Sequence, residues 1–124
     1  MHTAIYHTSD GNNKKVFQMA EIPTELKELM RRYIAQVNQV KQVDRAYLYG
    51  SYAKGRANKW SDIDIAIVSP DFSQDLFEER VFLMKLALNF DDRIEPSPFR
   101  PEDFNLDNPL VNEIDASGIE ICSE

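Results

Sequence analysis

The sequence has little of what a secreted, membrane-spanning or polyanion-binding protein needs. Its single cysteine, Cys122, cannot form an intrachain disulfide, and the N-terminus has no basic stretch followed by an apolar run. No apolar run approaches the roughly 20 residues of a membrane-spanning helix. Basic residues are scarce, because 14 Lys and Arg stand against 21 Asp and Glu, which gives a net charge of −7. We therefore expect a cytoplasmic protein that binds neither membranes nor nucleic-acid polymers.

What is present indicates one globular domain. The chain has 124 residues, of which 43% are apolar and 28% charged, within the ordinary range for folded proteins. An Asp10-Gly11 step between two short β-compatible stretches is a hairpin signal, and a mobile arm suits the same region equally well. We expect three parts: an N-terminal hairpin or arm (1–22, with stretches Thr3–Thr8 and Lys15–Ala20), a core (23–99), and a C-terminal helix and short strand (100–124).

Two segments have the three-and-four apolar spacing of a long helix. The first runs from Pro23, in its first turn, to about Lys41. The second runs from a cap at Ser73 to about Phe90, and its broad apolar face predicts extensive packing on a sheet. That face comprises Leu76, Phe77, Val81, Leu83, Met84, Ala87 and Leu88. Further on, we expect a helical turn at Pro101–Phe104 and a short helix from Asn108-Pro109 to near Gly118.

Four segments between Arg45 and Cys122 have the composition or alternation of β-strands. Arg45–Tyr49 is short, rich in aromatic residues and closed by a glycine. Asp62–Val68 alternates at its start, which places its isoleucines on one face and its two aspartates on the other. Arg93–Phe99 contains two prolines without amide donors, so we expect an edge strand there. Ile119–Cys122 is a candidate last strand.

The segment between the first two of these strands carries groups that suit phosphate binding. Gly50 and Ser51 follow a strand and precede a segment able to form a helical turn, so free amides and the Ser51 hydroxyl can converge on an anion. Lys54 adds positive charge beside them, as either a phosphate contact or a surface charge. We expect Arg56 and Lys59 to be surface charges.

Asp62 and Asp64 suit a metal ion. Their Cα atoms would lie roughly 6–7 Å apart on one strand face. Burying two like charges together is costly without a counter-charge, and all-oxygen ligands of this kind suit Mg²⁺. A phosphate cradle beside a Mg²⁺ site points to a nucleoside triphosphate.

The order Gly50-Ser51, ten residues, Asp62-x-Asp64 resembles the signature of the nucleotidyltransferase superfamily that includes DNA polymerase beta, in particular its minimal nucleotidyltransferase branch. The matching order of elements extends over roughly residues 23–99. This resemblance implies an α+β, palm-like fold with a mixed sheet flanked by helices. It also implies ATP as the donor and two Mg²⁺ ions that align the attacking oxygen with the α-phosphorus.

Carried over by residue, the resemblance implies that Gly50 and Ser51 hold the β- and γ-phosphates and that Asp62 and Asp64 bind metal. The family's third carboxylate comes from a later strand, where Glu95 is the candidate, with Asp91 and Asp92 as alternatives. Two positions depart from the common pattern. Glu95 stands where Asp is usual, and Lys54 stands where Arg often follows the Gly-Ser turn.

Many members of this branch resemble antitoxins encoded beside a HEPN-domain RNase toxin. The resemblance therefore implies a protein that transfers AMP to a hydroxyl, for which a tyrosine of a HEPN toxin is the expected acceptor. The short chain supports an acceptor outside it, because relatives that modify small molecules carry an added helical domain. Two alternatives stay open: a non-catalytic module that neutralises a toxin by binding, and transfer to a small molecule or an RNA end by a homo-oligomer.

The remaining distinctive residues have ordinary structural interpretations. We expect Trp60 to pack within its loop rather than stack on a base. His2 and His7 lie in the N-terminal arm and receive no role, and no neighbour in the sequence activates Cys122.

Overall fold

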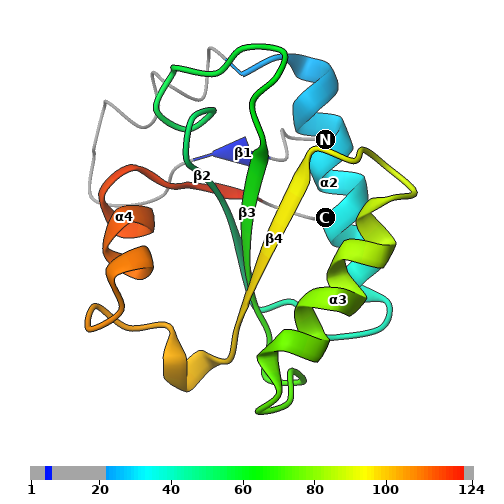
Figure 1. Ribbon diagram of the computed structural model, residues 1–124, viewed down its shortest axis with the longest axis vertical. Helices are drawn as coiled ribbons and strands as arrows, with labels where there is room; N and C mark the ends of the chain where they lie inside the picture. The colour runs from blue at the N-terminus through cyan, green and yellow to red at the C-terminus, as the bar shows by residue number, and fades with distance from the viewer. Residues whose placement is uncertain (1–4, 7–21, 122–124) are drawn as a thin grey trace.

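The computed structural model describes residues 5–6 and 22–121 as one mixed sheet with helices on both faces (Figure 1). The α+β class is the one that the sequence predicts. The strands are β1 (Ile5–Tyr6), β2 (Arg45–Tyr49), β3 (Ile63–Val68), β4 (Ile94–Phe99) and β5 (Ile119–Ile121); the helices are α2 (Thr24–Asn38), α3 (Leu76–Ala87) and α4 (Pro109–Ser117), with a 3-10 turn at Pro101–Asp103.

The strands are arranged in the order β1-β5-β2-β3-β4. β2 pairs antiparallel with both β3 and β5, whereas β3 and β4 are parallel and joined through α3. β4 is an edge strand, which confirms the prediction from Pro96 and Pro98. Proline suits this position because it has no amide hydrogen for a ladder on the outer side.

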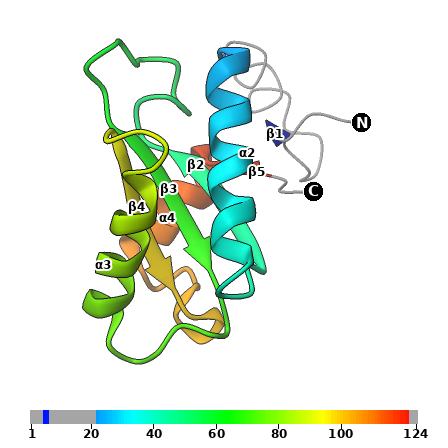
Figure 2. The ribbon, with the colours of Figure 1, turned by 90° about the vertical axis from the view of Figure 1, so that its right-hand side faces the viewer.

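Each face of the sheet has its own apolar core. Helices α2 and α3 cover one face, where Ile63, Ile65 and Ile67 are fully buried (Figure 2). Helix α4 covers the other face, where Ala66 and Phe99 pack with residues of that helix. The alternation of β3 therefore sends its isoleucines to the α2/α3 face and its aspartate to the α4 face.

The two helices on the first face are joined by a buried hydrogen bond. The Tyr33 hydroxyl of α2 donates to the carbonyl oxygen of Leu83 in α3 at 2.9 Å, and the Tyr33 side chain is fully buried. The ring of Phe90 packs edge-on against Tyr33 at a centroid distance of 5.7 Å. Burial raises the pKa of the Tyr33 hydroxyl, because the phenolate would lose its hydration.

Helix α3 corrects three predictions. Its N-cap is Asp75, whose carboxylate accepts from the amide of Glu78 at 3.1 Å, and not Ser73, which accepts from the amide of Asp75. The helix also ends at Ala87, before Phe90. The broad apolar face does not pack on the sheet as a whole, because a helix buries only the side that faces the sheet. Phe77 and Leu88 remain 74% and 70% exposed.

The other boundaries agree with expectation within a few residues. β2 has the predicted bounds, while β3 and β4 each begin one residue later than predicted, at Ile63 and Ile94. Helix α2 follows Pro23, its N-cap, and ends at Asn38 rather than at Lys41. Helix α4 begins as predicted, with the side chain of Asn108 accepting from the amide of Leu110 at 2.9 Å.

At the N-terminus only Ile5–Tyr6 is described, as a strand paired with β5. The second predicted stretch, Lys15–Ala20, the Asp10-Gly11 step and Cys122 lie outside the described residues. None of the helices in the described part of the chain combines the length and the apolar character of a membrane span.

We predict that Tyr33→Phe lowers the free energy of unfolding by about 1 kcal/mol, the usual net value of a buried hydrogen bond. The ring and its packing are retained, so the change isolates the hydroxyl. Urea unfolding followed by circular dichroism measures the difference. A variant as stable as the original chain would show that the bond between α2 and α3 contributes nothing.

Candidate active site

The turn after β2 presents backbone amides at the end of the sheet. Gly50 adopts a φ of +74°, which reverses the chain directly after Tyr49. The amide of Lys54 donates to the Gly50 carbonyl at 3.1 Å, which closes one helical turn. Within the described part of the chain, the amides of Ser51, Tyr52 and Ala53 have no hydrogen-bond partner. They form the positive end of a single turn, the backbone arrangement that favours an anion.

Gly50 also makes room for a carboxylate. A Cβ added to Gly50 would lie 2.2 Å from Oδ2 of Asp64, which is far inside van der Waals contact. Residues Tyr49 and Asp64 are register partners in the antiparallel β2–β3 ladder, so the turn begins beside the aspartate. The glycine therefore suits the backbone conformation of the turn, and a Cβ in its place would displace the Asp64 carboxylate opposite it.

The predicted third carboxylate lies next to the second. Asp64 of β3 and Glu95 of β4 are Cα partners in the parallel ladder, so their side chains leave the sheet on the same face. Neighbouring strands lie about 4.8 Å apart, which brings the two carboxylates into one site. The structure thus brings together Gly50, Asp64 and Glu95 from three neighbouring parts of the chain.

Asp64 is a half-buried carboxylate with neighbours of its own charge. It has no hydrogen bond or ion pair within the described residues. Burial raises the pKa of its carboxyl above the ordinary value, and the negative charges of Asp62, Glu95 and Glu113 raise it further. This environment favours any cation that compensates the cluster.

Asp62 lies just outside the strand in which the sequence placed it. β3 begins at Ile63, and the side chain of Asp62 is exposed at the end of the preceding loop. Two hydrogen bonds between Asn58 and Ser61 stabilise that loop. The amide of Asn58 donates to Ser61 Oγ at 2.9 Å, and the amide of Ser61 donates to the Asn58 carbonyl at 3.0 Å. The carboxylate is near enough to Asp64 to influence its pKa.

Glu95 has a basic partner that no local pattern predicts. Nη2 of Arg80, from α3, lies 3.2 Å from Oε1 of Glu95, with side chains 48% and 37% exposed. Because β4 is the edge strand, an arginine on α3 can reach the carboxylate at this border of the sheet. The pair is open to solvent, so its contribution to stability is small and it can be exchanged for another ligand.

Lys54 also forms an ion pair, with a carboxylate that the sequence does not predict to be at the site. Its Nζ is 3.2 Å from Oε2 of Glu113, a residue of α4. Only the packing of α4 over the sheet, through buried Val111 and Ile114, brings Glu113 to the site. Nothing in the local sequence around Glu113 distinguishes it from a surface glutamate. The site is therefore bordered by two ion pairs, one on the α4 side and one on the α3 side.

The alternative ligand Asp91 has a structural role. It accepts from Nη2, Nε and the amide of Arg93 at 2.8, 3.0 and 2.9 Å, and these bonds lower the pKa of its carboxyl. Arg93 in turn donates from Nη1 to the Tyr52 hydroxyl at 3.1 Å. Asp91 therefore helps to fix the turn after β2 through Arg93. The other alternative, Asp92, is exposed.

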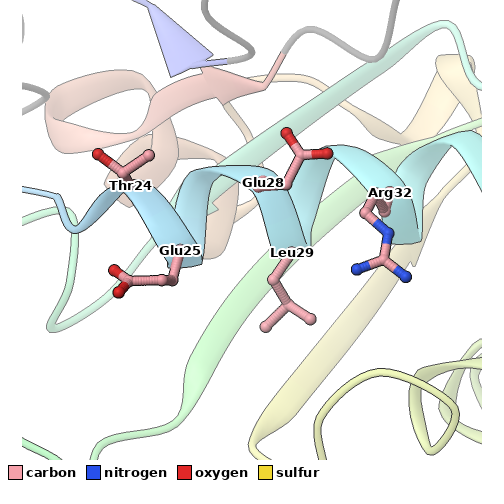
Figure 3. A pocket seen from close by; sticks show the side chains of 5 residues that line it. All are labelled: Thr24, Glu25, Glu28, Leu29 and Arg32. Carbon is pink, nitrogen blue, oxygen red and sulfur yellow. The ribbon is translucent and has the colours of Figure 1, made fainter.

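Trp60 corrects the expectation that it packs within its loop. Its side chain is 80% exposed, with Nζ of Lys59 over the ring at 5.0 Å from the centroid. Arg56 and Lys59 are exposed, as predicted. A shallow pocket elsewhere is lined by Thr24, Glu25, Glu28, Leu29 and Arg32, all of them residues of α2 and none from the motif (Figure 3).

The donor set fits a divalent cation, although the cluster is not compact. Among the described residues, no group of three or more His, Cys, Asp or Glu side chains is close enough together to hold a metal ion as it stands. Asp62, Asp64 and Glu95 nevertheless offer only carboxylate oxygens, and two of the three have no partner in the part of the chain that the structure describes. Oxygen ligands with room for water and phosphate suit Mg²⁺.

We predict that Gly50→Ala destabilises the protein more than Gly55→Ala. Gly55 has a similar φ of +72°, so both changes carry the backbone cost of about 1–2 kcal/mol for a left-handed alanine. Only the new methyl group at position 50 would meet the Asp64 carboxylate. Urea unfolding of both variants measures the difference, and equal losses would show that the carboxylate moves away at no cost.

We predict that Asp91→Asn lowers the free energy of unfolding at pH 7 by about 1 kcal/mol, the value of a partly exposed charged hydrogen bond. The folded pKa of Asp91 lies below its ordinary value of 3.8, so this stabilisation is complete above about pH 4. It disappears as the pH falls through the folded pKa. Unfolding measured across this range tests the sign, with Asp92→Asn as the exposed control. A difference independent of pH would contradict the ion-pair explanation.

Comparison with known proteins agrees with the site. The nucleotidyltransferase domain family matches residues 30–103, which include the Gly50 turn and all three carboxylates. A comparison with curated proteins finds no match. The chain is similar in fold to a toxin–antitoxin protein crystallised with AMP-PNP, at 22% identity over 73% of this chain and 70% of that chain, with a TM-score of 0.53. It is also similar to a mutant of the toxin–antitoxin MntA-HpeT, at 22% identity over 77% and 72%, with a TM-score of 0.52.

The family match covers more than half of the chain and spans β2, β3, α3 and β4. The two solved structures share the fold at this level of identity. The spacing of the motif, the register of Asp64 with Glu95 and the family match therefore lead to one conclusion: the chain belongs to the nucleotidyltransferase domain family.

Proposed function

We propose that this protein is a Mg²⁺-dependent nucleotidyltransferase that moves AMP from ATP to a tyrosine hydroxyl of a HEPN-domain toxin in the cytoplasm. The single observation that supports this transfer is the pairing of Asp64 and Glu95 in the β3–β4 register, next to Gly50, which has no side chain. It places a carboxylate pair next to a turn whose amides have no partner within the described residues, which is what a metal-bound triphosphate requires.

The turn and its neighbours would bind the triphosphate. Amides after Gly50 and the Ser51 hydroxyl are available to phosphate oxygens. Lys54 can add a positive charge when it leaves Glu113, and an exposed ion pair of this kind exchanges at little cost. The role of these groups is to hold the α-phosphorus in position, since in phosphoryl and nucleotidyl transfer the protein contributes mainly position and charge.

Asp62, Asp64 and Glu95 would hold two Mg²⁺ ions. When bound, the ions supply positive charge that stabilises the attacking oxygen and the leaving pyrophosphate. The three carboxylates would orient the triphosphate against the acceptor. Glu95 can bind through Oε2 while its Oε1 stays paired with Arg80, or through both oxygens once Arg80 leaves.

Each bond that forms or breaks in the proposed transfer can be assigned. The tyrosine oxygen forms a bond to the α-phosphorus, and the bond from that phosphorus to the bridging oxygen of the β-phosphate breaks. Pyrophosphate leaves with the electron pair. The hydroxyl proton passes to a carboxylate of the site, for which Glu95 is the candidate base. The product is a tyrosine that carries AMP through a phosphodiester bond.

Similarity in fold supports the choice of acceptor. Two solved structures of similar fold are toxin–antitoxin proteins, and one of them was crystallised with AMP-PNP. A second candidate function is neutralisation of a toxin by binding alone. It is favoured by one observation: each border ion pair already places a basic side chain on a carboxylate of the site.

We predict that Asp64→Asn lowers AMP transfer by about 100- to 1,000-fold, as expected when one preorganised charged group is removed from a transfer site. The assay combines the purified chain, Mg²⁺-ATP and the purified product of the adjacent reading frame, and detects AMP on the acceptor by mass spectrometry. Asp107→Asn is the matched control, since Asp107 is exposed and follows β4 beyond the opposite end of the sheet.

The two candidate functions give different results. Under the transfer proposal, the original chain modifies one tyrosine and releases pyrophosphate, and Asp64→Asn fails to neutralise the toxin. If neutralisation is complete with Asp64→Asn while no adduct forms with the original chain, binding alone is the function. An adduct that Asp64→Asn forms at the full rate would place the chemistry elsewhere.

A further inference from the structure

Trp60 is an exposed aromatic side chain in the loop that carries the motif. Its ring is 80% exposed, and of the large exposed apolar side chains among the described residues it is the only one between Gly50 and Asp62. A single exposed apolar side chain is ordinary on a protein surface, so exposure alone indicates no ligand. What distinguishes Trp60 is where the loop holds its ring.

Three hydrogen bonds centred on Asn58 define the loop around Trp60. The amide of Trp60 donates to Oδ1 of Asn58 at 2.8 Å. The amide of Asn58 donates to Ser61 Oγ at 2.9 Å, and the amide of Ser61 donates to the Asn58 carbonyl at 3.0 Å. The backbone that carries the indole is therefore already ordered, which lowers the entropy that a ligand loses by binding to it.

The same loop is joined to the amide turn and to the carboxylates. The Tyr52 hydroxyl, from the turn after β2, donates to the Asn58 carbonyl at 3.5 Å, and Nη1 of Arg93 donates to that hydroxyl at 3.1 Å. Trp60 also precedes Asp62 by two residues, so their Cα atoms lie at most about 7 Å apart. The loop thus connects the indole to both halves of the candidate active site.

One face of the indole ring is free. Nζ of Lys59 lies over the ring at 5.0 Å from its centroid and covers the other face. No further ring or cation in the described part of the chain stacks on Trp60. A flat apolar face beside a positive charge suits a planar ring that belongs to an anionic molecule.

Two features select a nucleobase as the occupant of this face. A nucleotide bound through its triphosphate carries its base one ribose away from the α-phosphate, so the base lies next to the groups that hold the phosphates. The neighbours of Trp60 in the loop are polar: Asn58, Lys59 and Ser61. A protein surface would need an apolar patch around the ring to bury, whereas a base needs only one aromatic face.

We propose that Trp60 is the base-binding residue of the candidate active site and that its free face stacks on the purine ring of the donor nucleotide. This inference rests on the proposed function, because it takes a nucleoside triphosphate as the donor. Stacking contacts the face of a base and not its hydrogen-bonding edge. The subsite therefore favours the larger purine rings over pyrimidines and distinguishes adenine from guanine only weakly.

Fluorescence reports the stack directly, because Trp60 is the only tryptophan in the 124 residues. The full chain with Mg²⁺ is titrated with a non-hydrolysable ATP analogue and, separately, with tripolyphosphate, which has the phosphates and no base. Excitation at the red edge of indole absorption avoids absorption by adenine. We expect the analogue to quench the emission to saturation and tripolyphosphate to leave it unchanged. Equal quenching by both ligands overturns base stacking.

Binding measured by titration calorimetry gives the size of the effect. Trp60→Leu should weaken binding of the ATP analogue about 5- to 100-fold, the loss expected for one base–aromatic stack. Trp60→Phe keeps an aromatic face and should lose less, and both variants should bind tripolyphosphate like the original chain. Phe77→Leu is the matched control, since it removes a ring that is 74% exposed on α3. Urea unfolding followed by circular dichroism should show equal stability, because the replaced rings are exposed.

The outcomes separate this subsite from the proposed transfer. Unchanged affinity in Trp60→Leu, or emission that does not respond to the bound analogue, overturns the subsite and leaves the transfer standing. Quenching and weaker binding as expected, without AMP transfer by the original chain, overturn the transfer and leave the subsite standing. If the product of the adjacent reading frame changes the emission and the analogue does not, the ring contacts the acceptor protein and base stacking is overturned. A chain that binds no nucleotide overturns both.

Discussion

The site depends on one close approach, between the Asp64 carboxylate and the Cα of Gly50. The β2–β3 ladder fixes this approach, because Tyr49 and Asp64 are opposite one another and the chain turns at the next residue. Any side chain at position 50 would occupy the place of the Asp64 carboxylate. The turn that offers amides to an anion and the strand that offers carboxylates to a cation are thus held at one fixed separation by the sheet.

The charged groups around this contact partly compensate one another. Asp64 lies near Asp62, Glu95 and Glu113, and these charges add to burial in raising its pKa. Two of the four carboxylates already have a basic partner, Arg80 for Glu95 and Lys54 for Glu113. Both pairs are solvent-exposed, so they neutralise the site weakly and reversibly. A cation or a triphosphate can therefore redistribute these charges without unfolding any element.

Several local patterns predicted the structure well because they depend on short-range constraints. The aromatic strand closed by Gly50, the proline-containing edge strand and the Asn108-Pro109 helix start all follow from steric or hydrogen-bonding limits within a few residues. Predictions that needed a choice between neighbouring polar groups were less accurate. Ser73 and Asp75 can each cap a helix, and the choice depends on the path of the chain after β3. The prediction that Trp60 packs within its loop was wrong, because the exposure of this side chain depends on what the loop packs against.

The sequence by itself determined the chemical groups of the site and the order in which they follow along the chain: the Gly50-Ser51 turn, the Asp62-x-Asp64 pair and Glu95 on a later strand. Tertiary structure alone decided what surrounds them. Arg80 reaches Glu95 from α3, and Glu113 reaches Lys54 from α4, across separations at which sequence spacing carries no geometric information. It also decided that one side of α3 stays exposed, because apolar periodicity shows that a helix side is apolar and not what covers it.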